Sequence, residues 1–193
     1  MVNDKYVSLV DKNGNEIEKL VYERIDIWKE YVLFSELWWL GVALSIIPWI
    51  IWFLIRKKDS ADRLMYAALF VMVISLCLDV LGDQLGIWSY RYNVIPVLPT
   101  YLPWDITLMP VTVIVILQFK PEGNPFVKAL IFAIISSYLA EPFFNKLQIY
   151  NLKHWKYTYS LPIQILIYLL AHYITKKDNF ALLIKSKKVE PRS

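Results

Sequence analysis

The stretch that decides the fold is LWWLGVALSIIPWIIWFLI, residues 37–55. It carries no charged side chain, and Arg56, Lys57 and Lys58 follow it at once. A helix rises about 1.5 Å per residue, so a run of this length crosses the roughly 30 Å hydrocarbon layer of a bilayer. Tryptophans near both ends and cations beyond one end are typical of the membrane–water interface. The sequence therefore predicts a transmembrane helix here.

Further apolar runs follow at about residues 64–88, 101–119, 125–144 and 161–175. Hydrophobic residues make up 57% of the 193-residue chain and charged residues 20%. A water-soluble domain does not need several membrane-length runs, which argues against that class. We predict an all-α fold, a polytopic membrane helical bundle of about five transmembrane helices with an amphipathic N-terminal helix before it. Its parts are a polar N-terminal segment (1–35), the transmembrane domain (36–177) and a basic tail (178–193).

The N-terminal segment is polar at first and then alternates between apolar and charged residues. Residues 11–15, DKNGN, have the composition of a turn. Residues 21–37 have helical spacing of apolar side chains, which predicts an amphipathic helix. This helix either lies in the membrane interface or leads directly into the first span. We favour the second arrangement, in which the two form one bent helix.

The basic residues predict the orientation. The net charge is +4, and the lysines and arginines gather beside apolar segments, at 56–58, 120–128 and 176–192. The positive-inside rule accounts for these groups, so a nucleic-acid partner is not needed. With about five spans the three groups share one side, which places the C-terminus in the cytoplasm and the N-terminus outside the cell. Lysines within 145–159 count against this orientation.

Acidic side chains within the apolar runs are the main candidates for function. Carboxylates are expensive in hydrocarbon and usually face the interior of a bundle. Asp79, Asp83, Asp105 and Glu141 lie in three of the runs, and Gln164 lies in the last. Counted at about 1.5 Å per residue from the outer ends of the helices, all five fall in the outer half of the bilayer. We therefore expect them to approach one another.

The spacing in the second run supports this convergence. Ser75, Asp79 and Asp83 recur every four residues and share one helix face, with Gly82 beside it. Small residues let a neighbouring helix approach closely, so this face should meet other helices. Two roles remain open for the carboxylates: a ligand site, or a structural network in which an outer-loop cation such as Arg91 makes them ionised.

Aromatic side chains surround the same level. They are either an interfacial belt without a specific function or the walls of a site. Together with the polar candidates they give a predicted ligand-binding set of Asp79, Asp83, Trp88, Trp104, Asp105, Glu141, Tyr150, Trp155, Tyr159 and Gln164.

The pair Glu141-Pro142 allows two interpretations. A proline inside a helix leaves a backbone carbonyl without its partner, and such backbone is tolerated at membrane depth only against protein or a watery cavity. The pair therefore indicates either a broken helix beside a cavity or the end of the fourth span.

Metal and disulfide chemistry find no support in the sequence. Cys77 is the only cysteine, so the chain has no internal disulfide. The two histidines, His154 and His172, are expected on opposite sides of the membrane, and nothing has zinc-like spacing. We expect neither a metal nor a cofactor.

The order of motifs over about residues 36–175 resembles a family of small uncharacterised multi-pass membrane proteins of spore-forming Gram-positive bacteria. The resemblance rests on LDVLG at 78–82, LGIWSY at 85–90, the prolines at 96 and 99, DITLMP at 105–110, Glu141-Pro142, Ile149-Tyr150, Trp155-Lys156 and YSLP at 159–162. It implies recurring polar and aromatic positions at Asp79, Trp88, Asp105, Glu141, Tyr150, Trp155 and Tyr159, whereas Asp83 and Gln164 depart from the usual residues. No activity comes with this resemblance.

A weaker similarity is to the membrane-embedded lycopene cyclase domain. It rests on GIWSY at 86–90 and LPWD at 102–105. That family's paired acidic residues after the proline are absent from this sequence, so the similarity does not imply the same chemistry.

Three functions are compatible with these patterns. The first is binding or transport of a lipid, isoprenoid or other amphiphile at the outer carboxylate and aromatic site. The alternatives are an intramembrane enzyme using acid catalysis on an isoprenoid-like substrate, and a structural subunit of a membrane complex. The expected partners are membrane lipid, an amphiphilic small molecule, and a membrane-protein partner or a second copy of the chain.

Overall fold

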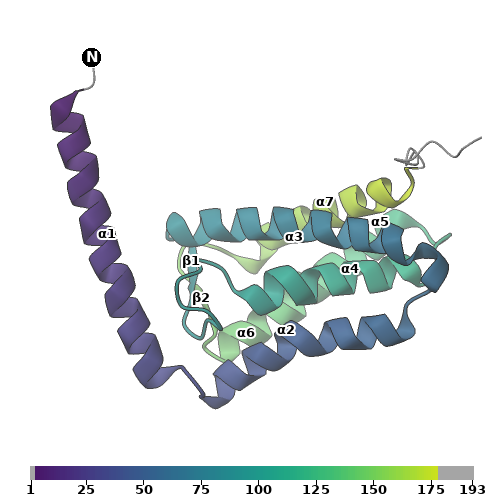
Figure 1. Ribbon diagram of the computed structural model, residues 1–193. Helices are drawn as coiled ribbons and strands as arrows, with labels where there is room; N and C mark the ends of the chain where they lie inside the picture. The colour runs from purple at the N-terminus through teal and green to yellow at the C-terminus, as the bar shows by residue number, and fades with distance from the viewer. Residues whose placement is uncertain (1–2, 178–193) are drawn as a thin grey trace, which may run out of the picture.

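The computed structural model describes residues 3–177 and is a bundle of helices (Figure 1), which confirms the predicted all-α class. The basic tail, 178–193, lies outside the described residues. The elements in chain order are α1 Asp4–Tyr31, α2 Glu36–Ile55, η1 Lys58–Ser60, α3 Ala61–Gln84, β1 Trp88–Tyr90, η2 Pro103–Leu108, α4 Met109–Gln118, α5 Pro125–Ile134, η3 Ile135–Ala140, α6 Glu141–Lys146, β2 Tyr150–Leu152 and α7 Tyr157–Thr175.

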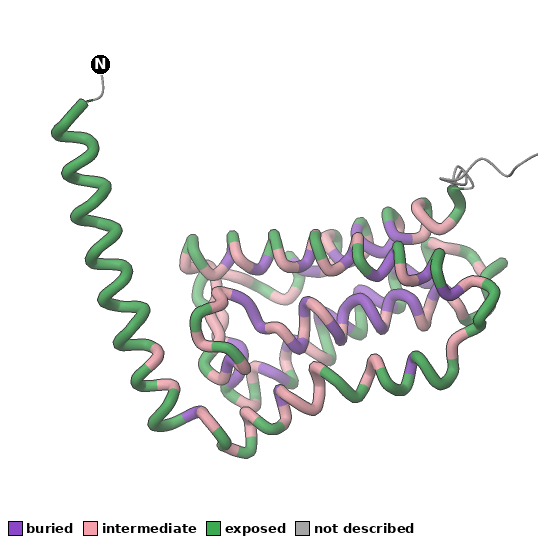
Figure 2. Tube along the Cα trace, in the orientation of Figure 1, coloured by how far each residue is buried: buried purple, intermediate pink, exposed green. Residues whose placement is uncertain are grey.

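The first helix is longer than the sequence indicated. α1 spans 28 residues without interruption, so the turn predicted at 11–15 is wrong. The side chain of Asn3 caps the helix by accepting from the backbone N–H of Tyr6 at 3.3 Å. Gly14 inside a helix costs about 1 kcal/mol relative to alanine, and the flanking helical turns outweigh this local preference. No residue of α1 is buried, and the helix extends away from the bundle (Figure 2).

A sharp corner separates α1 from α2, so the expected single bent helix is wrong. α1 ends at Tyr31, and Phe34 adopts a positive φ of 64°. Ser35 then starts α2 by accepting from the backbone N–H of Trp38 at 3.3 Å. The indole of Trp28 donates to the carbonyl of Asn93 at 2.7 Å, which holds the corner against the loop that precedes η2.

Within residues 3–177, three helices are long and apolar enough to cross a membrane by length and composition: Glu36–Ile55, Lys58–Gln84 and Pro125–Lys146. The helix Pro103–Gln118 is apolar but shorter. α7, expected as a span at 161–175, forms a helix of 19 residues and packs against α3 and α5.

The bundle buries an apolar core and also exposes apolar side chains. Trp52, Val71, Ile114, Phe132 and Tyr168 are among the core side chains with almost no exposure, and they come from five different helical segments. On the outward faces large apolar residues stay exposed, as Leu54 of α2 does at 80%. Contiguous exposed apolar surface is unusual for a monomer in water and typical of a surface that meets lipid or protein.

Two prolines are each preceded by a π-helical segment. η2 comes before Pro110 and η3 before Pro142. A proline has no N–H, so the carbonyl four residues earlier needs another partner. The carbonyl of Ile106 finds it in the indole of Trp49, which donates at 3.0 Å. The helix that contains Pro142 continues to Lys146, so the interpretation that it ends at Glu141 is wrong.

A small antiparallel sheet of two strands, β1 and β2, which the sequence did not indicate, closes one end of the bundle. β1 and β2 pair antiparallel, with Trp88 opposite Leu152 and Tyr90 opposite Tyr150. Gly86, with a φ of +67°, makes the turn from α3 into β1. This two-stranded sheet joins the connection after α3 to the connection before α7, and it brings aromatic residues from both to the same end of the bundle.

Candidate functional site

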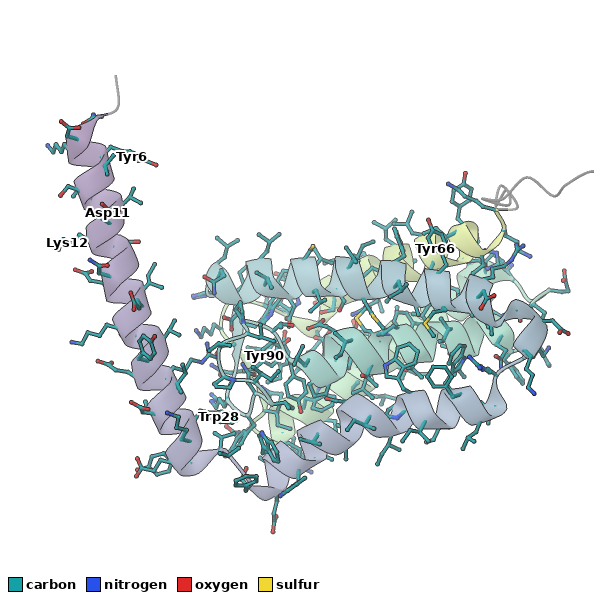
Figure 3. All side chains as sticks on the ribbon, in the orientation of Figure 1. Tyr6, Asp11, Lys12, Trp28, Tyr66 and Tyr90 are labelled. Atoms are coloured by element: carbon teal, nitrogen blue, oxygen red, sulfur yellow. The ribbon has the colours of Figure 1, made fainter. Side chains whose placement is uncertain are left out.

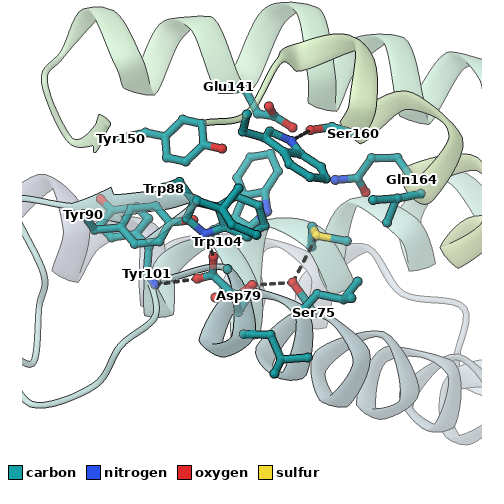
Figure 4. Close-up of a pocket in the computed structure, with 18 of the residues that line it drawn as sticks. Ser75, Asp79, Trp88, Tyr90, Tyr101, Trp104, Glu141, Tyr150, Ser160 and Gln164 are labelled. Carbon is teal, nitrogen blue, oxygen red and sulfur yellow. Dashed lines mark hydrogen bonds between the residues drawn. The ribbon is translucent and has the colours of Figure 1, made fainter. Parts of the chain in front are cut away.

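A cavity of about 240 Å³ lies beneath the two-stranded sheet, between α3, η2, α6 and α7 (Figure 4). The polar and aromatic side chains that line it come from segments far apart in the sequence. Eight of the ten residues in the predicted ligand-binding set line this cavity: Asp79, Trp88, Trp104, Asp105, Glu141, Tyr150, Trp155 and Gln164.

The other two predicted residues lie outside the cavity lining. Asp83 is half-buried near the end of α3. Tyr159 is exposed, and its ring packs edge-on against Trp155 with 5.4 Å between the ring centroids. Tyr159 therefore supports a wall of the cavity from behind.

Asp79 is the centre of a hydrogen-bond network. Its Oδ1 accepts from the indole N–H of Trp88 at 2.8 Å and from the hydroxyl of Tyr90 at 2.7 Å. Its Oδ2 accepts from the backbone N–H of Tyr101 at 3.0 Å. Three donors from two other segments thus converge on one buried carboxyl group, which anchors β1 and the segment just before η2 to α3.

Asp105 is also satisfied by protein groups. Its carboxyl accepts from the hydroxyls of Ser75 and Thr100, and the side chain has no exposed surface. Ser75 lies one turn before Asp79 on α3, as the predicted stripe required. The two aspartates therefore belong to one wall of the cavity, and each is held by internal donors.

Gly82 makes this wall possible. A Cβ atom at this position would lie 1.9 Å from Cζ2 of Trp88. The indole can rest against the α3 backbone only because no side chain stands there, and this position brings its N–H to Asp79.

The opposite wall has polar atoms without partners. Glu141 is 9% exposed, and its Oε2 accepts no hydrogen bond within residues 3–177. Gln164 is 6% exposed, and its Oε1 is equally without a donor. Both line the cavity, where Figure 4 shows Glu141 beside Ser160. Buried polar atoms are nearly always hydrogen-bonded, so two orphan acceptors in one cavity indicate a ligand or water position.

The aromatic rings form a connected shell. Trp88 meets Trp155 edge-on at 5.0 Å, and Tyr90 stacks on both Tyr101 at 5.4 Å and Tyr150 at 5.5 Å. Burial raises the pKa of the phenols of Tyr90 and Tyr150, so both stay neutral, and the charge of Asp79 adds to the effect at both. These rings are packed around the cavity.

No lysine, arginine or histidine is among the residues that line the cavity. Arg91, the cation that the structural interpretation invoked, donates instead to the backbone carbonyl and side chain of Gln148 at 3.3 and 3.2 Å. The described part of the chain also contains no group of three His, Cys, Asp or Glu side chains placed to hold a metal. The two aspartates of the cavity are therefore stabilised by hydrogen bonds, and no cation of residues 3–177 lines the cavity.

Sequence reasoning missed four residues that shape the site: Tyr90, Tyr101, Thr100 and Ser160. Ser160 accepts from the indole of Trp155 at 2.9 Å. The signal for Tyr90 was its position in the run WSY, where alternate residues of an extended segment point to one side, so that Trp88 and Tyr90 reach the same carboxyl group. The backbone N–H of Tyr101 left no signal, because any residue supplies one.

Comparison of the chain with protein-family models, with curated proteins and with solved structures gives no match.

Proposed function

We propose that this chain is a multi-pass membrane protein that binds an amphiphile in the cavity beneath the two-stranded sheet. The observation that carries the proposal is the pair of buried acceptors without partners, Glu141 Oε2 and Gln164 Oε1, in a cavity with aromatic and apolar walls. Small-molecule sites are mostly apolar with a few placed polar groups. An amphiphile matches both parts, because its head satisfies the acceptors and its chain contacts the apolar lining.

The proposed arrangement has five spans, with the two-stranded sheet at the outer surface of the membrane. In Figure 1 the ends of α2 and α7 and the connection between α4 and α5 lie at the end of the bundle away from β1 and β2. Arg56, Lys57, Lys58 and Lys120 lie on these connections. The positive-inside rule makes that end cytoplasmic. The N-terminus and the cavity are then on the outer side of a cell membrane.

α1 lies across the outer end of the bundle in this arrangement (Figure 3). Tyr6 points to the same side as Trp28, which contacts the bundle, whereas Lys12 points away. A helix with one apolar stripe on the membrane side suits the interface plane. The expectation of an interfacial helix thus replaces the continuous bent helix.

Two sets of single cysteines test this arrangement in a Cys77→Ser background. In intact cells an impermeant thiol reagent should label Lys5→Cys and should leave Lys58→Cys unmodified; the reverse pattern would invert the topology. In nanodiscs an environment-sensitive dye should emit at shorter wavelength from Val10→Cys than from Lys12→Cys. Equal emission from the two positions would remove α1 from the membrane interface.

The test of binding is mass spectrometry of small molecules and lipids that copurify with the protein. The wild type, Glu141→Gln and Glu122→Gln are compared, since Glu122 is exposed and offers the same chemical change away from the cavity. We expect a species present with the wild type and Glu122→Gln and depleted at least several-fold with Glu141→Gln. An identical profile in all three folded proteins would refute binding at this cavity.

Acid catalysis on an isoprenoid-like substrate is the second candidate. It is favoured by the same glutamate, because a carboxylic acid among ring faces can transfer a proton to a double bond while the rings stabilise the carbocation. Incubation with a panel of polyenes separates the two functions: an isomerised or cyclised product indicates an enzyme, and a bound but unchanged polyene indicates a binding protein.

A further inference from the structure

The charge of the cavity lining restricts the head group of its ligand. Three acidic side chains line the cavity, Asp79, Asp105 and Glu141, and no basic side chain does. An anionic head group, such as a phosphate or a carboxylate, would meet carboxyl groups and no cation. Like charges in a site of low dielectric repel strongly, so an anion is disfavoured.

The hydrogen-bond inventory points the same way. Several donors near the carboxyl groups are already used: Trp88 and Tyr90 donate to Asp79, and Trp155 donates to Ser160. Ser75 donates to Asp105. Three buried atoms of the lining residues lack a partner: two are acceptors, the Oε2 of Glu141 and the Oε1 of Gln164, and the third is the hydroxyl of Tyr101, which lies beside Gly41. For Glu141 and Gln164 the missing partner is therefore a donor.

The rings add a further preference. Trp88, Trp104, Tyr150 and Trp155 all line the cavity. The face of an aromatic ring carries partial negative charge and attracts an ammonium group, more so where water is excluded. The lining also contains apolar side chains, such as Ile163 and Ile167 of α7, that suit an alkyl chain.

We propose that the cavity takes the protonated amine of an amphiphile, with N–H groups donated to Glu141 and Gln164 and with ring faces around the nitrogen. This inference rests on the proposed function, because it names the head group that the amphiphile carries. An N–H-bearing ammonium group fits better than a quaternary one, since a quaternary nitrogen has no proton to give to the two acceptors.

The experiment compares four probes that share an eight-carbon chain: n-octylamine, n-octyltrimethylammonium, 1-octanol and n-octyl sulfate. The protein is purified in a non-ionic detergent at pH 7, where an alkylamine is protonated because its pKa resembles the ~10.4 of lysine. Thermal unfolding and tryptophan fluorescence are followed as each probe is added. Octylamine should raise the melting temperature at a concentration at least tenfold lower than any of the other three.

The variants show whether the effect comes from the cavity. Glu141→Gln should remove the advantage of octylamine over octanol, and Glu122→Gln should keep it. Gln164→Leu provides a second cavity variant if Glu141→Gln does not fold, and it should weaken octylamine several-fold. An unchanged octylamine preference in a folded cavity variant would overturn the proposal.

The probes also separate this inference from the proposed function. If octanol acts as well as octylamine in the wild type and loses its effect in the cavity variants, the amphiphile site stands and the amine is wrong. A preference for octyl sulfate or for the quaternary probe overturns the amine in the same way. If no probe acts on the wild type, both the amine and the amphiphile site fall.

Discussion

Replacing Asp79 by alanine should loosen the end of the bundle that carries β1 and β2. The change removes the acceptor of three hydrogen bonds, from Trp88, Tyr90 and the backbone of Tyr101, at 2.7–3.0 Å. A hydrogen bond to a charged group contributes about 1.5–3 kcal/mol, although polar pairs in membrane bundles average nearer 0.6 kcal/mol. Because the three bonds share one acceptor and are not additive, we expect a total loss of about 3–5 kcal/mol. This lowers the melting temperature by on the order of 10 °C for a chain of this size.

The assay is thermal unfolding in detergent at a fixed scan rate, followed by tryptophan fluorescence. Asp83→Ala is the matched control, because Asp83 lies one turn further along α3 but outside the cavity lining. Asp79→Asn should fall between the wild type and Asp79→Ala. Its amide oxygen can still accept from Trp88 and Tyr90, whereas its NH₂ group would face the N–H of Tyr101. Equal melting temperatures for the Asp79→Ala and Asp83→Ala variants would refute the anchoring role.

Three further predictions concern other parts of the structure. Gly82→Ala should destabilise by about 1–3 kcal/mol in thermal unfolding, because Trp88 must move away, whereas Gly14→Ala, with open space around it, should raise stability by about 0.5–1 kcal/mol; equal effects would contradict the close packing at Gly82. Lys128→Met should cost about 1–3 kcal/mol, because the ammonium group donates to the carbonyls of Ile116 and Phe119, and an unchanged melting temperature would show that these bonds are dispensable. The raised pKa of Tyr90 means that its contribution to stability is constant below about pH 10, where a free phenol titrates, and is lost above it; Tyr90→Phe should flatten that alkaline fall, and an identical pH profile would exclude Tyr90 as its source.

Composition alone predicted the helices of the bundle closely. The run at 37–55 corresponds to Glu36–Ile55, and the run at 125–144 corresponds to Pro125–Lys146. Long apolar stretches have one stable backbone conformation in hydrocarbon, so their identity depends little on distant contacts. The N-terminal helix was predicted less well, because DKNGN has the local chemistry of a turn and only its neighbours on both sides keep it helical.

The two-stranded sheet could not be predicted by the same reasoning. Each strand has three residues, and its partner lies about 60 residues away in the sequence. Short extended segments carry little periodicity, and only the packed bundle brings the two together. The missed partners of the aspartates, Tyr90 and Tyr101, follow from this, because both lie on segments whose position is set by tertiary contacts.

Counting depth along the helices was enough to gather most of the cavity lining, but it could not divide the carboxyl groups by role. Asp79 and Asp105 looked equivalent to Glu141 in the sequence. In the structure the aspartates have internal donors, and Glu141 has an oxygen without one. The difference depends on side chains that reach across from other helices, which a depth estimate does not contain.

This division implies opposite signs for two neutralising substitutions in the ligand-free protein. At Asp79 the negative charge is stabilised by three donors, so its removal lowers stability. At Glu141 one oxygen is buried without a partner, which lowers the free energy of unfolding, and we expect the residue to be kept for its function. Glu141→Gln should therefore leave the melting temperature unchanged or raise it, by up to about 2 kcal/mol in free energy of unfolding. A ligand at a hundred times its dissociation constant adds about 2.7 kcal/mol to the wild type by linkage, and it should reverse that order. Destabilisation by Glu141→Gln equal to that by Asp79→Asn would place both carboxyl groups in one structural network and would leave the cavity without a ligand site.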